Sequence, residues 1–286
     1  GIRGNVRNDA RGVQIEAFGD ESALARFVDE LRAEPPPAAR IVGLQQQSIA
    51  ESAADGFVIE RSARNGERAL SIPPDLATCE ECVRELFDPD DRRHGYPFTN
   101  CTACGPRFTI ATDIPYDRVS TTMSRFEMCD ACRQEYEDVE DRRYHAQPNA
   151  CPRCGPRLSF VSLSESVSME RDPLRAAAAL LREGGVVGVK GLGGFHLACD
   201  ATNAGAIALL RERKRRDEKP FAVMVQDLTA ACAAAELGKQ EEALLTGVER
   251  PIVLAPALEG SSIAGEVSPD TPLIGLFLPY TPLHHL

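Results

Sequence analysis

The N-terminal segment of the chain alternates apolar and polar positions with two different periods. Residues 12–18, GVQIEAF, alternate with a period of two, as a half-buried strand does. Residues 21–34 space their apolar positions as an amphipathic helix does, and a run of prolines follows them. Short apolar runs within 39–50 and 56–63 predict two more strands. The pattern therefore predicts a small α+β unit over residues 1–65.

The middle segment, residues 72–160, is polar, punctuated by prolines, and contains an internal repeat. Residues 79–107 and 129–157 share every cysteine, a DRR triplet and the closing string CGPR. With so few apolar residues, this segment could not fold by burying a hydrophobic core alone. Bound metal would supply the missing free energy, on the order of 10 kcal/mol for each structural zinc. The repeat is thus predicted to be a duplicated metal-binding module.

The C-terminal segment, residues 165–286, alternates helical patterns with short apolar strands. The run DPLRAAAALLREGG predicts a helix that Asp172 caps and a glycine pair ends. AGAIALLRERKRR predicts a second helix. VVGVKG predicts a strand of the buried type, and KPFAVMV and PIVLA predict two more strands. Helices that alternate with apolar strands indicate an α/β domain.

Composition limits the class of protein. The chain has 286 residues, of which 43% are hydrophobic and 26% charged, as in ordinary globular proteins. Its net charge of −11 argues against non-specific nucleic-acid binding, which needs a basic face. No apolar run is long enough to span a membrane, and no signal segment follows Gly1. We therefore expect a cytoplasmic, multidomain α+β protein and a piece of a longer polypeptide, with no membrane or nucleic-acid partner.

Cysteine spacing carries the strongest chemical signal. Paired CxxC units at this spacing predict two closed sites of four cysteines each for structural zinc. A secreted disulfide framework and a redox-active CxxC are the alternatives, and the regular repeat disfavours both. Cys199 and Cys232 stand outside the motif and are not expected to be nucleophiles. The predicted metal ligands are Cys79, Cys82, Cys101, Cys104, Cys129, Cys132, Cys151 and Cys154.

The sequence leaves two ways to distribute these cysteines between two metals. In a neighbour pairing, each CxxC-x18-CxxC copy holds one ion. In a nested pairing, the four inner cysteines of residues 101–132 hold one ion and the four outer cysteines hold the other. We favour the nested pairing, because residues 107–122 resemble a short hairpin between a glycine turn and a helix start, the order of a treble-clef zinc site.

Two basic features of the C-terminal segment predict contacts with phosphate. Lys190 opens a glycine-rich turn after a strand, where backbone N–H groups could approach an anion. The cluster RERKRR at 211–216, with Lys219 beyond it, is a cationic patch in an acidic chain. A tight structural turn and a solvated helix face are the alternatives. In the N-terminal segment, Asn8 could orient a water beside a phosphoryl group, although Asn is also a common turn residue.

In order along the chain, these strings resemble the HypF family, the carbamoyltransferases that help to mature NiFe hydrogenases. GNVRND and GVQIEAFGD are similar to part of its acylphosphatase-like domain. The doubled CxxC-x18-CxxC repeat, with DRR and CGPR, is similar to its zinc-finger region. KGLGGFHLACDATN, KPFAVM and LPYTPLHHL are similar to its YrdC-like domain.

The resemblance implies a route from carbamoyl phosphate to a protein thiol. The acylphosphatase-like domain would hydrolyse carbamoyl phosphate, and the YrdC-like domain would use ATP, with Mg²⁺, to form carbamoyl adenylate. A further TsaD-like domain would pass the carbamoyl group to the C-terminal cysteine of HypE. Asn8 would orient the attacking water. The residues that would bind the nucleotide phosphates or the carbamoyl group are Lys190, His196, Lys214, Arg216 and Lys219.

The chain departs from the family pattern at both ends. The phosphate-cradling loop is expected before Gly1, and a Ser-Ala-Asn stretch and the TsaD-like domain are expected after Leu286. Asp217 stands where a proline is common, which we expect to be tolerated. The expected fold is a truncated acylphosphatase-like unit of ferredoxin type, a zinc-finger region with two four-cysteine sites and an incomplete α/β YrdC-like domain, inactive alone. A YrdC-type threonylcarbamoyl-adenylate synthase and a non-catalytic zinc-ribbon module are the alternative functions.

Overall fold

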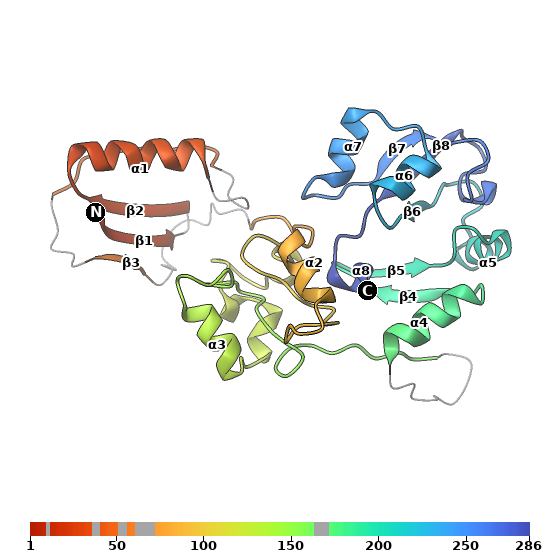
Figure 1. Cartoon of the computed structure of the whole chain (residues 1–286), viewed down its shortest axis with the longest axis horizontal. Helices are drawn as coiled ribbons and strands as arrows, with labels where there is room; N and C mark the ends of the chain where they lie inside the picture. Colours follow the sequence, from red (N-terminus) through yellow and green to blue (C-terminus); the bar gives the residue numbers. More distant parts are fainter. Residues whose placement is uncertain (10–11, 36–40, 51–55, 61–71, 163–171) are drawn as a thin grey trace. The chain divides into compact units, whose positions relative to one another are not determined.

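The computed structural model describes residues 1–9, 12–35, 41–50, 56–60, 72–162 and 172–286 (Figure 1). The chain divides into two compact units. The first unit consists of residues 1–75 and 100–149, and the second of residues 76–99 and 150–286. Among the described residues, no helix is long and apolar enough to cross a membrane.

The N-terminal part of the first unit is a three-stranded sheet with one helix (Figure 1). Strands β1 (Arg3–Asp9) and β2 (Gly12–Phe18) are antiparallel, and β3 (Phe57–Ile59) lies parallel to β1 on its other side. Helix α1 (Glu21–Ala33) begins where the Asp20 carboxylate accepts a hydrogen bond from the backbone N–H of Ala23. The predicted helix and two of the predicted strands are thus confirmed.

The strand predicted at 39–50 is absent from the described part of that range, because residues 41–50 have no regular secondary structure.

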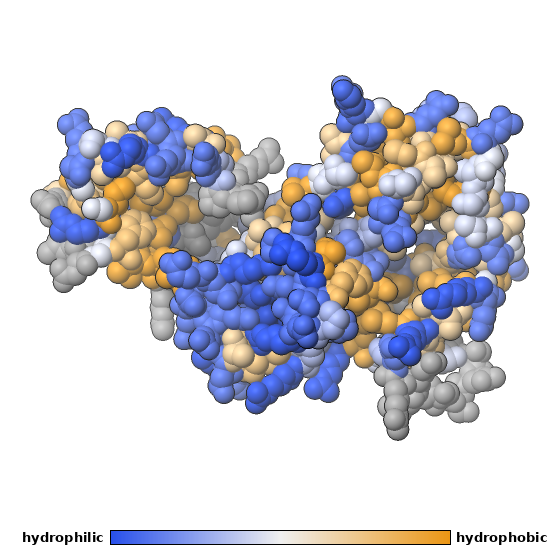
Figure 2. Space-filling model, in the orientation of Figure 1, coloured by the Kyte–Doolittle hydropathy of each residue, from blue (hydrophilic) through white to orange (hydrophobic). Residues whose placement is uncertain are grey.

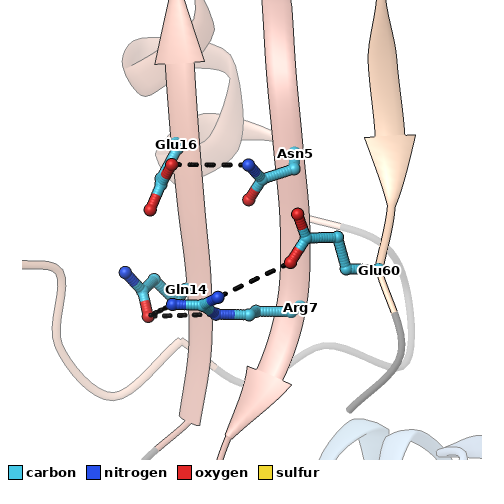
Figure 3. A network of polar contacts seen from close by, with 5 residues as sticks. All are labelled: Asn5, Arg7, Gln14, Glu16 and Glu60. Atoms are coloured by element: carbon cyan, nitrogen blue, oxygen red, sulfur yellow. Dashed lines mark hydrogen bonds and ion pairs between the residues drawn. The ribbon is translucent and has the colours of Figure 1, made fainter. Parts of the chain in front are cut away.

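One face of the sheet carries a polar network. The register pairs Asn5 with Glu16 and Arg7 with Gln14, so these side chains share a face. The guanidinium of Arg7 donates to the Gln14 side-chain oxygen at 2.9 Å and lies 3.5 Å from a carboxylate oxygen of Glu60 (Figure 3). The polar pairs hold β1, β2 and the residue after β3 in register.

The residues around the cysteine repeat form two short helices and a series of tight turns. Helices α2 (Glu80–Phe87) and α3 (Asp130–Glu137) occupy equivalent places in the two copies. The hairpin predicted between the copies is absent: a single bridge joins Ala111 and Thr121, and the chain otherwise follows three 3₁₀ turns. These turns are η1 (Phe108–Ile110), η2 (Arg118–Ser120) and η3 (Thr122–Arg125).

The C-terminal part of the second unit contains two small sheets and five helices of the described chain (Figure 1). In the first sheet, β4 (Val187–Lys190) and β5 (Phe195–Ala198) are antiparallel. In the second, β8 (Leu273–Phe277) lies between β6 (Ala222–Met224), which is parallel to it, and β7 (Val253–Pro256), which is antiparallel. The helices are α4 (Pro173–Arg182), α5 (Ala204–Lys214), α6 (Leu228–Ala234), α7 (Lys239–Thr246) and α8 (Pro282–His285).

The core of this part lies on one face of the second sheet. Leu276 and Leu245 have no exposed surface, and Ile207 of α5 is almost fully buried with them. On the opposite face Leu254 remains 65% exposed. Buried and exposed positions alternate along β7 with a two-residue period, as in a strand that has one face on the core.

The hydropathy of the surface differs between the parts of the chain. Hydrophilic surface covers much of the finger around α3, whereas apolar surface is visible around α6 and α7 (Figure 2).

Candidate functional site

The eight repeat cysteines gather into two groups of four. One group contains the cysteines of the first copy and the other contains those of the second copy. Within each group all four sulfur atoms lie within 4.8 Å of one another. The neighbour pairing is therefore the one that the structure forms, and the nested pairing that we expected is wrong. The groups are Cys79, Cys82, Cys101 and Cys104, and Cys129, Cys132, Cys151 and Cys154.

The spacing of the sulfur atoms fits a tetrahedral zinc site. Four thiolates at about 2.3 Å from zinc are separated from one another by about 3.8 Å. The Sγ atoms of Cys101 and Cys104 are 3.7 Å apart, and those of Cys151 and Cys154 are 3.8 Å apart. None of these eight cysteines forms a disulfide. A closed set of four thiolates leaves no position for water or substrate, so each site suits a structural ion.

The first CxxC of each copy lies at the start of a helix. Cys79 is the N-cap of α2 and Cys129 is the N-cap of α3. Cys82 and Cys132 then fall within the first helical turn, where both are fully buried. The N-terminus of a helix favours the thiolate form, because unpaired N–H groups and the helix dipole stabilise negative charge there. Both helices therefore begin inside the CxxC pair, at Glu80 and Asp130, and continue through the residues that follow it.

The second CxxC of each copy lies in a tight turn. The N–H of Cys154 and the N–H of Gly155 both donate to the carbonyl of Cys151. In the first copy, the N–H of Ala103 points at the sulfur of Cys101 at 3.4 Å. Gly105 follows with a φ of 92°, a conformation that favours glycine.

The reversal after each helix explains why the pairing is local. In the first copy, the N–H of Gly95 donates to the carbonyl of Leu86 near the end of α2. Gly95 has a φ of 64°, and His145 holds the same place in the second copy with a φ of 53°. Consecutive turns then return the chain to its own helix start. The prediction failed because it rested on a hairpin that does not form.

Asn8 lies in β1, where its backbone pairs with Val13. Its side chain lies outside the described part of the structure, so its role remains a prediction.

Lys190 and His196 lie on opposite faces of the β4–β5 sheet. The register places Lys190 beside Phe195 and Val189 beside His196. The ammonium nitrogen of Lys190 lies 5.2 Å from the centre of the Phe195 ring, and both side chains are exposed. The structure thus does not bring these two predicted site residues together on one face.

His196 instead joins a cluster of rings with two residues that the sequence analysis did not single out. Its ring is stacked against that of His284 at 6.1 Å and lies 6.5 Å from that of Tyr280. Burial, with the nearby His196, lowers the pKa of His284 to about 4, so its imidazole is neutral at physiological pH. Tyr280 and His284 belong to LPYTPLHHL, a string that marked the family resemblance but predicted no contact.

Two arginines of the basic cluster, Arg211 and Arg216, form hydrogen bonds with backbone carbonyls of the loop that follows α5. The Arg216 guanidinium donates to the carbonyls of Lys219 and Pro220 and lies over the Phe221 ring. Arg211 covers the same ring and donates to five backbone carbonyls. The side chains of Lys214 and Lys219 are exposed. These two lysines are therefore open to an anion, whereas Arg216 mainly shapes the loop that carries Lys219.

A pocket of about 420 Å³ lies within the second unit. Its walls are apolar and polar in similar measure, and they include both imidazoles of α8. Burial also lowers the pKa of His285, which favours a neutral imidazole there. The lining residues are Phe87, Met224, Val225, Gln226, Asp227, Pro279, His284 and His285.

Three protein-family models match successive parts of the chain. The Acylphosphatase family matches residues 1–59, and the family described as HypF finger matches residues 78–111 and 128–161. The Sua5/YciO/YrdC family, described as telomere recombination, matches residues 179–286. The fold and the two four-cysteine sites thus define a multidomain α+β protein with acylphosphatase-like, HypF-finger and YrdC-like parts.

Named relatives match the whole chain. Carbamoyltransferase HypF2 of Cupriavidus necator is 50% identical over 290 residues, which cover 100% of this chain and 36% of that protein. Carbamoyltransferase HypF of Rhizobium leguminosarum bv. viciae is 50% identical over 285 residues, which cover 100% of this chain and 35% of that protein. The chain therefore spans a little over a third of the length of these relatives.

Two solved structures of HypF match nearly the whole chain. A crystal structure of full-length HypF in the phosphate- and nucleotide-bound form matches with a TM-score of 0.91 and 42% identity, over 99% of this chain and 37% of that one. The crystal structure of HypF from T. kodakarensis matches with a TM-score of 0.85 and 44% identity, over 99% of this chain and 36% of that one. The chain belongs to the HypF family and matches about a third of the length of these proteins.

Proposed function

We propose that this segment prepares an activated carbamoyl group inside a carbamoyltransferase, and that the whole protein passes the group to the C-terminal cysteine of HypE. The observation that carries the proposal is the unbroken match of the chain to carbamoyltransferases named HypF. The proposed location is the cytoplasm, where the eight cysteines would stay reduced and available as zinc ligands.

The proposed chemistry has three steps. Hydrolysis of carbamoyl phosphate yields carbamate and phosphate. A carbamate oxygen then attacks the α-phosphorus of ATP, and the bond to pyrophosphate breaks, which leaves carbamoyl adenylate. The thiolate of the acceptor cysteine finally attacks the carbamoyl carbon, and AMP leaves. The first two steps develop negative charge on phosphoryl oxygens, which needs fixed cations, Mg²⁺ and N–H donors nearby.

Lysine side chains of the YrdC-like part are proposed to supply much of that charge. Lys190 ends β4 directly before the glycine-rich turn, and Lys214 ends α5. Lys219 lies on the loop that Arg216 shapes. All three lysine side chains are exposed, so a phosphate could approach their ammonium groups from solvent.

The remaining proposed roles fall to His196, Asn8 and the eight repeat cysteines. His196 is held by the neutral His284 and by Tyr280 on the face opposite Lys190, where it could bind the carbamoyl end of the substrate. Asn8 is proposed to orient the water that attacks carbamoyl phosphate. The two four-cysteine sites would hold zinc as a structural ion, which stabilises the finger and takes no part in the reaction.

The experiment that tests the proposal is ATP–pyrophosphate exchange by a full-length protein that carries this segment. We expect exchange that depends on carbamoyl phosphate. Lys190→Ala should reduce it roughly tenfold or more, because a cation at the phosphates is lost. Lys239→Ala makes the same change at an exposed position of α7 and should leave the rate unchanged.

Three results would contradict the proposal. Exchange that depends on threonine and bicarbonate instead would favour a YrdC-type threonylcarbamoyl-adenylate synthase, which the match of residues 179–286 also allows. Bound zinc without ATP binding would favour an interaction module. Normal exchange by the Lys190→Ala variant would remove Lys190 from the phosphate site.

A further inference from the structure

Two buried arginines hold equivalent positions in the duplicated finger. Arg93 is the last residue of the DRR triplet in the first copy, and Arg143 is its counterpart in the second. Their exposed fractions are 1% and 3%, which is unusual for arginine. In each case the backbone N–H donates to the aspartate that opens the triplet, at 2.7 Å. The turn that carries each arginine is therefore fixed in the same way.

The side chain of each arginine donates a hydrogen bond to the other copy of the repeat. The Nε–H of Arg93 donates to the carbonyl of Ala150 at 3.0 Å. The Nε–H of Arg143 donates to the carbonyl of Asn100 at 3.1 Å. Asn100 and Ala150 are themselves equivalent positions of the repeat, and both are buried. The two bonds thus form a reciprocal exchange between the copies.

The accepting carbonyls stand next to metal ligands. Asn100 directly precedes Cys101, and Ala150 directly precedes Cys151. Each arginine also lies between the two CxxC pairs of its own copy, so its backbone is held at both ends by its own centre. A charged donor on a buried carbonyl forms one of the stronger hydrogen bonds in a protein, and its loss leaves both groups poorly satisfied.

We propose that Arg93 and Arg143 are positioning residues that couple the two four-cysteine centres, so that loss of metal from one centre weakens the other. Loss of the first ion loosens the segment that carries Arg93, and the turn before Cys151 then loses its buried donor. The reverse path runs through Arg143 to Cys101. Partners outside the metal ligands commonly set ligand orientation and metal affinity in this way.

The test is a mutant cycle on the zinc-loaded chain, read as the rate of zinc release to a chromophoric chelator. Cys79→Ser disrupts the first centre directly. We expect it to speed release from the second centre roughly tenfold, the scale of one charge-assisted hydrogen bond. Arg93→Lys should speed that release by a similar factor, and Cys79→Ser should then add no further increase. Arg125→Lys is the control and should change nothing, because Arg125 is exposed at the end of η3.

Two outcomes would overturn the coupling. Release from the second centre within about twofold of the unmodified chain after Cys79→Ser would show independent centres. An undiminished effect of Cys79→Ser in the Arg93→Lys background would show coupling by another path.

A measurement without any arginine variant keeps the proposal testable if Arg93→Lys does not fold. At one equivalent of zinc, native mass spectrometry should find mainly chains with no zinc or two. A majority of singly loaded chains would contradict the proposal.

Discussion

Gly155, which follows the last metal-ligating cysteine, lies in one of the most crowded places in the second copy of the finger. A Cβ at this position would lie 2.1 Å from the hydroxyl oxygen of Tyr96 and 2.6 Å from the Cβ of Ala150. Tyr96 is 3% exposed, so its ring cannot swing into solvent. Gly155→Ala must therefore displace buried atoms next to Cys151 and Cys154.

The expected loss of stability follows from the atoms that the added Cβ must displace. Overpacking of a close-packed interior costs about 1–3 kcal/mol. The Tyr96 hydroxyl donates to the carbonyl of Pro156 at 3.3 Å, and loss of that bond adds about 0.5–1.5 kcal/mol. The lower entropy of alanine in the unfolded chain offsets about 0.4–1 kcal/mol. We expect the free energy of unfolding to fall by about 2 kcal/mol.

The assay is urea denaturation at fixed free zinc, followed by circular dichroism. In the Tyr96→Phe background, Gly155→Ala should cost about 1 kcal/mol less, because the nearest clashing atom is gone. Gly265→Ala is the matched control: no atom lies within 4 Å of its added Cβ, so it should not lower stability and should raise it by at most about 1 kcal/mol, the entropic gain alone. Unchanged stability of Gly155→Ala would refute the packing argument, as would an equal cost in both Tyr96 backgrounds.

Three further changes test other parts of the structure. The pKa of His284 is lowered from 6.5 to about 4, so the unfolded chain binds more protons than the folded chain between these pH values. The free energy of unfolding should therefore fall as the pH drops from 6.5 to 4. His284→Phe should flatten that dependence, measured by urea titrations at several pH values. Arg211→Lys removes most of the donors to five carbonyls and should lower the free energy of unfolding by about 1.5–3 kcal/mol, whereas an unchanged midpoint would contradict this. Alkylation of chains with Cys129→Ser should modify Cys151 before Cys101, and the reverse order would argue against neighbour pairing.

The local elements of the finger were predictable because their signals are local. A cysteine followed by a charged, helix-forming run predicts a helix start, and CGPR predicts a turn. Which cysteines share a metal depends on the reversal at Gly95 and His145. Glycine signals such a left-handed turn, but histidine does not, and the structure uses both.

In the other parts of the chain, the sequence also failed to predict some elements and contacts. A strand needs a partner, and residues 41–50 have none in regular structure although part of their sequence is apolar. The sequence does not predict strand β5, because its four residues are too few to show a period. The contact of His196 with Tyr280 and His284 joins residues far apart in sequence, and only the fold brings them together.

The central structural claim is that each copy of the repeat holds its own zinc ion. Anomalous diffraction at the zinc edge tests it most directly. We expect two peaks, one within about 2.3 Å of the sulfurs of both Cys79 and Cys101, and the other equally close to those of both Cys129 and Cys151. A single peak shared by Cys101 and Cys129 would contradict this pairing.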